Sequence, residues 1–346
     1  MGDKSFTTEL MTSDYTDYSL PSDNGLCEYE RHSAGFLPVF YSLLFVFGLI
    51  SNGLVLWVML MCVKLQSITD MCLLNLTVAD LLLLITLPFL AHYSRADWVF
   101  GPGMCKVVMS SYYIGFNGSI FFIVIMSIDR YLAVVHAVSS LKTRTRRYQA
   151  IMIGITWILA LLASFPEIAL VEFHSQNDTR LCEFGHETKV QWRAFGLFKM
   201  NVTSLLIPFF IMVFCYSMIL RRILFLKSTK KTICLVLLVV MVFFCCWTPY
   251  NVASFFYALE LVNIYIPCES SKVIRLSLQV TEAVAYSHTC LNPIIYVFVG
   301  QKFRSHLFKL MNRMPCVYNK LIISSVASES SESHRSNTTT NATSVA

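Results

Sequence analysis

Residues 105–138 read CKVVMSSYYIGFNGSIFFIVIMSIDRYLAVVHAV, and this stretch decides the class of fold. Between Cys105 and Ile128 its only charged residue is Lys106, and then an acid and an arginine stand side by side at Asp129 and Arg130. A helix needs about 20 predominantly apolar residues to cross roughly 30 Å of hydrocarbon. The stretch therefore indicates a transmembrane helix that ends in a charged pair.

The whole chain has the composition of a membrane protein. Of its 346 residues 55% are hydrophobic and only 14% are charged, and its mean hydropathy of +0.59 is too apolar for an ordinary soluble domain. Seven stretches are long enough to span a bilayer: residues 35–62, 69–93, 105–135, 148–170, 194–224, 232–259 and 274–299. Since they are far longer than the roughly ten residues of a barrel strand, we expect an all-α membrane protein with a seven-transmembrane helix bundle.

The basic residues set the expected orientation. The loops after the third and fifth stretches are rich in Lys and Arg, and the loop after the first holds Lys64, whereas the loop after the second holds only Arg95 and that after the sixth only Lys272 and Arg275. Cytoplasmic loops carry the excess of Lys and Arg. We therefore expect a multi-pass protein of the plasma membrane with an extracellular N-terminus and a cytoplasmic C-terminus.

Residues 1–34 are expected to form an acidic extracellular arm. The arm carries seven acidic residues against two basic ones, which favours a basic partner. Acids flank Tyr15 and Tyr18, a context suited to sulfation, so both tyrosines are candidate ligand-binding residues. The alternative is a solvated, disordered leader. Asn177, in the second outer loop, is the accessible N-glycosylation acceptor.

The helix bundle is expected over residues 35–300, followed by two cytoplasmic segments. Residues 301–314 alternate basic and apolar residues, a pattern that predicts a short amphipathic helix on the membrane surface. Cys316, just after it, is a candidate for palmitoylation. Residues 315–346 end in a Ser- and Thr-rich tail that we expect to be disordered and that phosphorylation would make strongly negative.

Four cysteines fall on the expected extracellular side, where oxidation is permitted. They are Cys27, Cys105, Cys182 and Cys268. Four cysteines allow three pairings, and sequence alone does not choose among them. The expected topology favours Cys105 with Cys182 and Cys27 with Cys268, which would staple the loops around the outer end of the bundle.

Polar residues inside the spans are functional candidates because they are costly in hydrocarbon. Asp80, Asn52, Ser119 and Asn292 are expected to form a hydrated cluster able to hold a sodium ion. The alternative, equally favoured, is a hydrogen-bond network that joins helices. Prolines inside the spans bend helices, and Trp247 stands two residues before one of them, Pro249.

Taken together, these motifs resemble a rhodopsin-class G-protein-coupled receptor over about residues 35–313. They are Asn52, Leu76–Asp80, Asp129-Arg130-Tyr131, Trp157, Pro208 with Tyr216, Cys246-Trp247-Thr248-Pro249 and Asn292-Pro293-Ile294-Ile295-Tyr296. The resemblance implies that Asp129 holds Arg130 at rest through a charge-assisted hydrogen bond. It also implies that the freed arginine helps to engage a G protein when the sixth helix swings outward.

Four finer motifs narrow the class: residues 129–138, Thr86-Leu87-Pro88, residues 287–293 and the Cys27 and Cys268 pair. These motifs resemble those of chemokine receptors, especially the C-C subfamily. The resemblance implies that Tyr41, Tyr112 and Glu282 line the ligand pocket and that Glu282 faces the basic N-terminus of the ligand. The alternative for Glu282 is a salt bridge inside the pocket. One departure is Leu90, which stands where these receptors usually carry a tryptophan in the pocket.

The resemblance implies a set of partners and excludes others. We expect a small basic chemokine, a heterotrimeric G protein of the inhibitory class, a receptor kinase and arrestin at the tail, and membrane lipid; we expect no nucleic acid and no cofactor beyond the sodium ion. Chemotaxis and calcium signalling would follow.

The motifs Gly-x-Ser-x-Gly, His-Glu-x-x-His and Gly-x-x-x-x-Gly-Lys are not found, which argues against an enzyme. The alternatives are a scavenging chemokine receptor without G-protein coupling and a peptide receptor of another branch.

Overall fold

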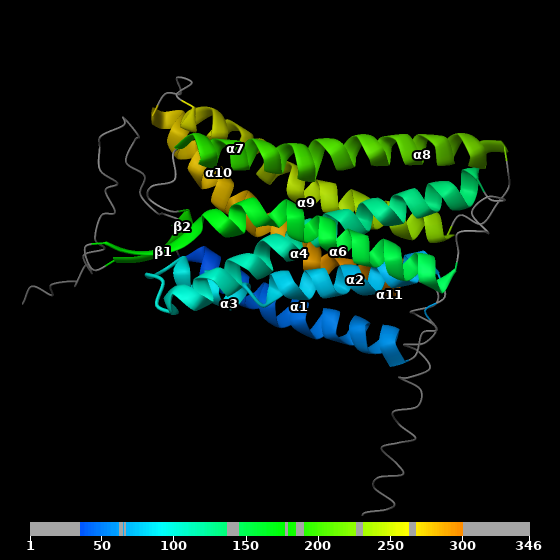
Figure 1. The fold of residues 1–346 in the computed structure, drawn as a ribbon, viewed down its shortest axis with the longest axis horizontal. Coiled ribbons are helices and arrows are strands. Elements are labelled where there is room, and N and C mark those ends of the chain that lie inside the picture. Colours follow the sequence, from blue (N-terminus) through cyan, green and yellow to red (C-terminus); the bar gives the residue numbers. More distant parts are fainter. Residues whose placement is uncertain are drawn as a thin grey trace, which may run out of the picture.

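A computed structural model describes residues 35–61, 65, 67–136, 145–176, 179–184, 190–225, 231–262 and 268–299. Helices run almost the full length of these segments (Figure 1). In chain order the elements are α1 (Phe36–Met61), α2 (Ile68–Leu84), α3 (Leu87–Tyr93), α4 (Gly101–Val135), α6 (Arg146–Leu170), β1 (Val171–Gln176), β2 (Thr179–Phe184), α7 (Val190–Asn201), the π-helix η2 (Val202–Leu206), α8 (Ile207–Phe225), α9 (Lys231–Leu261), α10 (Cys268–Tyr286) and α11 (His288–Val299).

Six helical stretches of the described residues are long and apolar enough to cross a membrane. They are Phe36–Met61, Ile68–Tyr93, Gly101–Val135, Arg146–Leu170, Val190–Arg222 and Ile233–Leu261. The stretch predicted at residues 274–299 is also helical, but it is divided into α10 and α11, and neither half qualifies alone. The elements lie side by side as a bundle (Figure 1), so the fold is that of an all-α membrane protein.

The division at Ser287 has a local cause. The amide of Ser287 donates to the carbonyl of Val284 and the amide of Cys290 donates to the carbonyl of Ser287, each at 3.1 Å. These bonds span three residues instead of four, which tightens the chain into a 3₁₀ turn. The second span breaks in the same way at Thr86, whose amide and hydroxyl both donate to the carbonyl of Leu83 at 3.1 and 2.6 Å. Pro88 opens α3 there.

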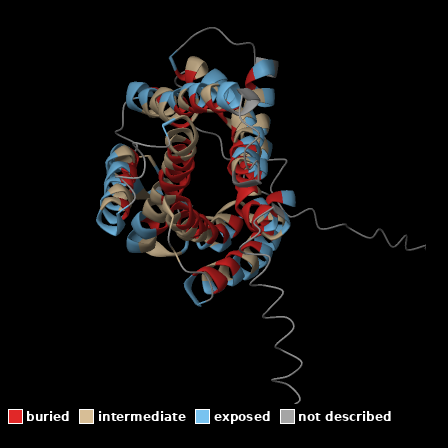
Figure 2. Cartoon of the chain, turned by 90° about the vertical axis from the view of Figure 1, so that its right-hand side faces the viewer, coloured by how far each residue is buried: buried red, intermediate tan, exposed pale blue. Residues whose placement is uncertain are grey.

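The bundle is apolar both inside and outside. The buried residues lie mainly on the helix faces turned to the centre of the ring, whereas the exposed ones lie mainly on the outward faces (Figure 2). Many of the outward side chains are large and apolar, among them Phe47, Phe165, Phe210 and Phe298, each more than 60% exposed. A soluble protein rarely exposes so much apolar surface. This exterior suits the hydrocarbon of a bilayer.

The long helix α4 is the centre of the bundle, because it contacts α2, α6, α8 and α9. Gly115 lets α2 come close: a Cβ atom there would lie 2.8 Å from the carbonyl oxygen of Ala79 and 3.1 Å from Leu83. Small residues permit such close contacts between transmembrane helices. The α2–α4 contact also brings polar residues of the two helices within hydrogen-bonding distance of one another.

We expect Gly115→Leu to destabilise the protein by about 1–3 kcal/mol, because the added side chain overpacks the α2–α4 contact. The measurement is thermal unfolding of the purified protein in detergent. Gly154→Leu is the matched control, since a Cβ at Gly154 would meet nothing within 4 Å. An unchanged unfolding temperature in Gly115→Leu would contradict the described contact.

Candidate functional site

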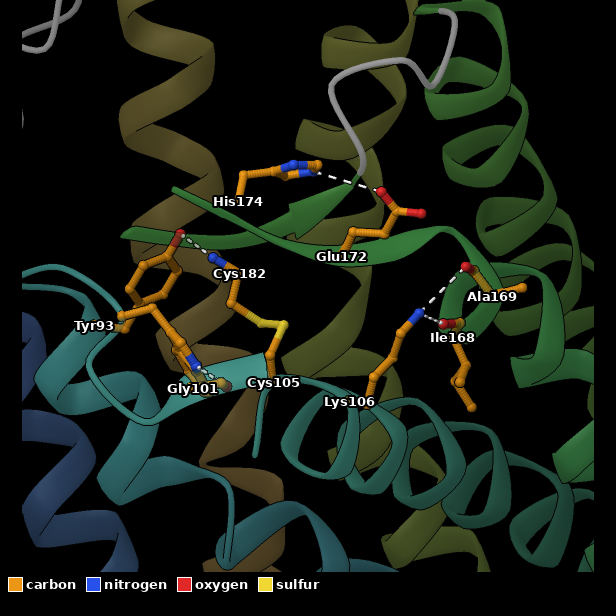
Figure 3. Close-up of a disulfide and its surroundings, with 10 residues drawn as sticks. Tyr93, Gly101, Cys105, Lys106, Ile168, Ala169, Glu172, His174 and Cys182 are labelled. Atoms are coloured by element: carbon orange, nitrogen blue, oxygen red, sulfur yellow. Dashed lines mark hydrogen bonds and ion pairs between the residues drawn. A yellow bond between two sulfur atoms is a disulfide. The ribbon is translucent and has the colours of Figure 1, made fainter. Parts of the chain in front are cut away.

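A disulfide fixes the loop that covers one end of the bundle. Cys105, in the first turns of α4, is bonded to Cys182 of β2, and their Cα atoms lie 5.7 Å apart (Figure 3). The strands β1 and β2 form an antiparallel hairpin in which Cys182 faces Phe173. The amide of Cys182 donates to the hydroxyl of Tyr93 at 3.3 Å. The hairpin is therefore held over α3 and α4.

Lys106 extends this anchor to the neighbouring helix. Its Nζ donates to the carbonyl oxygens of Ile168 and Ala169 at 3.0 and 3.3 Å (Figure 3). These carbonyls belong to the last turn of α6, where a cation is favoured by the helix dipole. The single charge in the apolar stretch of α4 thus stabilises the same end of the bundle.

Four tyrosines surround Glu282 beneath the hairpin. Tyr41 of α1 and Tyr112 of α4 both contact the ring of Tyr286, with centroids 5.6 and 6.0 Å apart. Tyr286 donates a hydrogen bond of 3.4 Å to Oε1 of Glu282. Tyr250 of α9 lies beside Tyr112 and Glu282. The structure thus brings together the three residues expected in the pocket from α1, α4 and α10.

Sequence reasoning missed Tyr250 and Tyr286. Tyr286 could have been found, because it stands four residues after Glu282 and therefore on the same helix face. Tyr250 gives no such pattern beyond its place after Pro249. Within the described part of the chain, Glu282 forms no ion pair with a basic residue; the ion pairs there involve other acids. Glu282 is therefore a carboxylate of this pocket without an ion-pair partner among the described residues.

Trp247 lies directly below the tyrosines. Its ring is 4.4 Å from that of Phe116 of α4, and its Nε1 donates to Nδ1 of His288 of α11 at 3.1 Å. Its carbonyl accepts from Asn251, whose Oδ1 accepts from Ser204 of η2 at 2.9 Å. Trp247 is therefore connected to three other spans, two residues before Pro249 inside α9.

Asp80 is the centre of a buried polar cluster. Ser119 Oγ donates to its Oδ1 at 3.0 Å, and Asn292 Nδ2 donates to its Oδ2 at 2.8 Å. His288 Nε2 lies 3.6 Å from Oδ1. Asn52 was expected to belong to this cluster, but it does not bond to Asp80. Its Nδ2 donates instead to the carbonyls of Gly48 and Thr289 at 3.0 and 2.8 Å. Asn52 joins α1 to α11 instead.

The donor atoms of this cluster fit a sodium ion. Hard cations take oxygen ligands, and the carboxylate of Asp80 and the hydroxyl of Ser119 are both fully buried. Oδ1 of Asn292 is buried without a hydrogen-bond partner among the described residues, which leaves an oxygen available to a cation. Tyr296 lies nearby in sequence, one turn after Asn292, and its hydroxyl is likewise buried without a described partner.

At the other end of the bundle Asp129 holds Arg130. Oδ2 of Asp129 accepts from Arg130 Nε at 3.1 Å, and Arg130 Nη2 forms an ion pair with the same oxygen. Thr69 of α2 donates to it as well, at 2.9 Å. The side chains of Asp129 and Arg130 are only 10% and 14% exposed. Arg130 is thus held against α4 in this arrangement.

Sequence reasoning missed Thr69, although a local pattern marks its position. Ser67 and Asp70 form a capping box that begins α2, with Asp70 N donating to Ser67 Oγ at 3.0 Å. The box fixes the first turn of α2 and with it the direction of Thr69. No pattern in the sequence shows that Thr69 reaches Asp129, because that contact joins two helices.

The other residues expected at this end make contacts of their own. Tyr131 contacts His136, with its hydroxyl 3.1 Å from Nε2, and its ring packs on Phe214 of α8. The hydroxyl of Tyr216 is buried and lies close to Ser127 and Arg130. Pro293 lies inside α11, before Tyr296.

Several predicted residues lie outside the described residues. They are Tyr15, Tyr18, Cys27, Asn177, Cys316 and the segments 1–34, 301–314 and 315–346. Cys268 begins α10, but the structure describes nothing of its side chain. Leu90, the departure in the pocket, is half-buried on α3 and packs against the core.

Comparisons with known proteins place this arrangement in a family. A sequence model described as "7 transmembrane receptor (rhodopsin family)" matches residues 51–296. The C-C chemokine receptor type 8 of Homo sapiens is 42% identical over 315 residues, which cover 89% of each chain. The chain belongs to the chemokine receptor family. The mouse type 8 receptor is 40% identical over 86% of each chain, and the human C-C chemokine receptor type 4 is 41% identical over 80% of this chain and 77% of its own length.

The family assignment defines the class of protein in which the site lies. This chemokine receptor is a multi-pass membrane receptor of the rhodopsin type and not an enzyme. Its two buried polar clusters, at Asp80 and at Asp129, and the tyrosine pocket around Glu282 occupy successive levels of one seven-transmembrane bundle.

Proposed function

We propose that this receptor binds a small basic chemokine on the extracellular side of the plasma membrane and activates a heterotrimeric G protein of the inhibitory class. The N-terminus would be extracellular and the C-terminus cytoplasmic. The observation that carries the proposal is Glu282: a carboxylate among four tyrosines, without a basic partner among the described residues. An acid in the outer half of a span calls for a cation, and the amino terminus of a basic ligand supplies one.

Binding is proposed to proceed in two stages. The acidic arm of residues 1–34, including Tyr15 and Tyr18, first attracts the basic chemokine, which mainly raises the association rate. The flexible end of the ligand then enters the pocket between Tyr41, Tyr112 and Glu282. Disulfides at Cys105–Cys182 and Cys27–Cys268 would keep the entrance open.

Activation requires the ligand to bind the active arrangement more tightly than the described one, because equal affinity for both shifts no population. Contact with the tyrosines is proposed to move Trp247, and the bend at Pro249 would carry that movement to the inner half of α9. Arg130 would then leave Asp129 and enter a cavity beside Tyr216. Chemotaxis and calcium signalling are the expected responses.

The remaining partners are proposals of the same kind. Asp80, Ser119 and Asn292 would hold a sodium ion, whose positive charge would neutralise the buried carboxylate and favour the described arrangement. A receptor kinase would phosphorylate the tail, and arrestin would bind it. Asn177 would be glycosylated and Cys316 palmitoylated, the latter fixing the tail to membrane lipid.

The second candidate function is scavenging, in which chemokine is bound and internalised without G-protein activation. Both functions need the same outer pocket, so the inner end decides between them. The hydrogen bonds of Thr69 and Arg130 to Asp129 favour signalling, since they form the restraint that activation would release.

A binding screen tests the proposal. The full-length receptor in lipid nanodiscs is exposed to a panel of purified chemokines, and binding is measured by competition against one fluorescently labelled chemokine at a time. At least one chemokine is expected to bind saturably. If none binds while a peptide hormone library yields a ligand, the receptor belongs to another branch in function and the proposal fails.

A further inference from the structure

A groove opens on the outer surface of the bundle between α9 and α10. Its volume is about 660 Å³, and its walls include Cys245, Pro249, Ala253 and Phe256 of α9 and Ser277 and Thr281 of α10. Small-molecule sites have similar volumes, roughly 300–1,000 Å³. None of the tyrosines around Glu282 lines it.

The groove faces the hydrocarbon of the membrane. Its α9 wall belongs to the spanning stretch Ile233–Leu261, and Cys245, Pro249 and Phe256 are exposed there. Water is absent from this region of a bilayer. Any molecule that fills the groove therefore comes from the membrane itself.

Contacts above and below the groove tie α9 to its neighbours. Toward the hairpin end, Glu260 of α9 forms an ion pair with Arg275 of α10 at 3.1 Å and accepts a 2.7 Å hydrogen bond from Ser271. Deeper in the bundle, Trp247 bonds to His288 of α11. The α9 wall of the groove is thus held at both levels by contacts that lie outside the groove itself.

The hydroxyl groups of Thr248 and Ser277 lie on the lining of the groove. Within the residues that the structure describes, the hydroxyls of Thr248 and Ser277 make no hydrogen bond, although both residues line the groove. Thr281 donates to the carbonyl of Ser277 at 2.5 Å, so its oxygen can still accept. Polar groups left unpaired in hydrocarbon are unfavourable. They favour an occupant that carries a hydrogen-bonding group of its own.

We propose that this groove binds a membrane sterol. No charged residue lines the groove, so the phosphate of a phospholipid finds no counter-charge, whereas a neutral hydroxyl matches Thr248, Ser277 and Thr281. The rigid ring system of a sterol would pack on Ala253 and Phe256. A rigid body loses less conformational entropy on binding than a flexible acyl chain does.

The bound sterol contacts α9 on both sides of Pro249, because Cys245 precedes the proline and Ala253 follows it. It therefore stabilises the described conformation of α9 around Pro249, in the arrangement in which Asp129 holds Arg130. This consequence does not depend on which ligand enters the pocket around Glu282, so the sterol site and the proposed chemokine function can fail separately.

Photolabelling tests the site directly. The full-length receptor in phosphatidylcholine nanodiscs is illuminated with a diazirine analogue of cholesterol, and labelled peptides are mapped by mass spectrometry. Labelling is expected to concentrate on residues 244–256 and 273–281 and to be competed by unlabelled cholesterol. Two results would overturn the proposal: uniform labelling of all outward helix faces by the cholesterol analogue, or equal labelling of the groove by a diazirine phospholipid.

Three variants sharpen the test. Ala253→Leu fills the groove and Ser277→Ala removes one hydroxyl, so labelling in the groove should fall about tenfold in the first and less in the second. Gly154→Leu places the same leucine on α6 in open space and should label like the native chain. Undiminished labelling in both groove variants would contradict a sterol in this groove.

Thermal unfolding gives a readout that needs no label. A ligand that binds the folded protein raises its unfolding temperature, so cholesterol in the nanodiscs should stabilise the native receptor and Gly154→Leu but not Ala253→Leu. If Ala253→Leu proves too unstable to purify, Ser277→Ala replaces it and should show a smaller shift than the native chain. Equal stabilisation of all variants would contradict the proposal.

Discussion

Arg130→Ala is expected to abolish chemokine-stimulated G-protein activation while chemokine affinity stays unchanged. The guanidinium of Arg130 lies against Asp129 at the inner end of α4, far along the chain from Cys105 and the hairpin at the other end of the same helix. Its removal therefore leaves the ligand pocket intact. It takes away the cation that the proposed mechanism releases toward the G protein.

The measurement is nucleotide exchange by the G protein, with chemokine binding determined on the same membranes. Arg147→Ala is the matched control, because Arg147 is an exposed arginine in the first turn of α6 and should not alter exchange. A native exchange rate in Arg130→Ala would show that release of this arginine is not part of activation.

Glu282→Gln is expected to lower chemokine potency by about 10- to 100-fold. The substitution keeps the size of the side chain and its hydrogen bond with Tyr286 but removes the charge. A hydrogen bond to a charged group contributes about 1.5–3 kcal/mol, which corresponds to about one to two powers of ten in affinity. The measurement is a dose-response curve for G-protein activation with a chemokine that binds.

Glu183→Gln is the control for Glu282→Gln. Glu183 lies on β2 and is 45% exposed, in a 3.8 Å ion pair with Arg193, and exposed pairs contribute only about 0–1 kcal/mol. A chemokine with an acetylated N-terminus supplies the second control, since it has already lost the amino group that Glu282 would bind. If Glu282→Gln lowers the potency of the acetylated chemokine by as much as it lowers that of the unmodified chemokine, the assigned contact between Glu282 and the ligand's amino group is wrong.

Much of the fold follows from local patterns. The apolar stretches predict the spans, and Thr86-Leu87-Pro88 marks the break before α3 because proline lacks an amide hydrogen. The division at Ser287 could not be predicted in that way, since no proline stands at the break and hydrogen bonds over three residues produce it. The seventh predicted span is divided at that break and is not among the six qualifying stretches of the described residues.

The candidate site was predictable where one helix carries the pattern. Asp129 and Arg130 are adjacent, and Tyr286 follows Glu282 by one turn. Contacts between helices were not predictable: Thr69 reaches Asp129, His288 reaches Trp247, and Asn52 bonds to the carbonyl of Thr289 instead of joining Asp80. Their partners depend on how each helix is rotated in the bundle, and residue spacing along one chain segment does not determine that rotation.

A chemokine that enters the pocket around Glu282 is expected to activate a G protein through Arg130. We would measure nucleotide exchange in nanodiscs that contain only the native receptor and a purified inhibitory-class G protein. At least one chemokine of the panel is expected to accelerate exchange, and Arg130→Ala should remove this acceleration while the chemokine still binds. Saturable chemokine binding without any acceleration in the native receptor would show that the protein is a scavenger and not a signalling receptor.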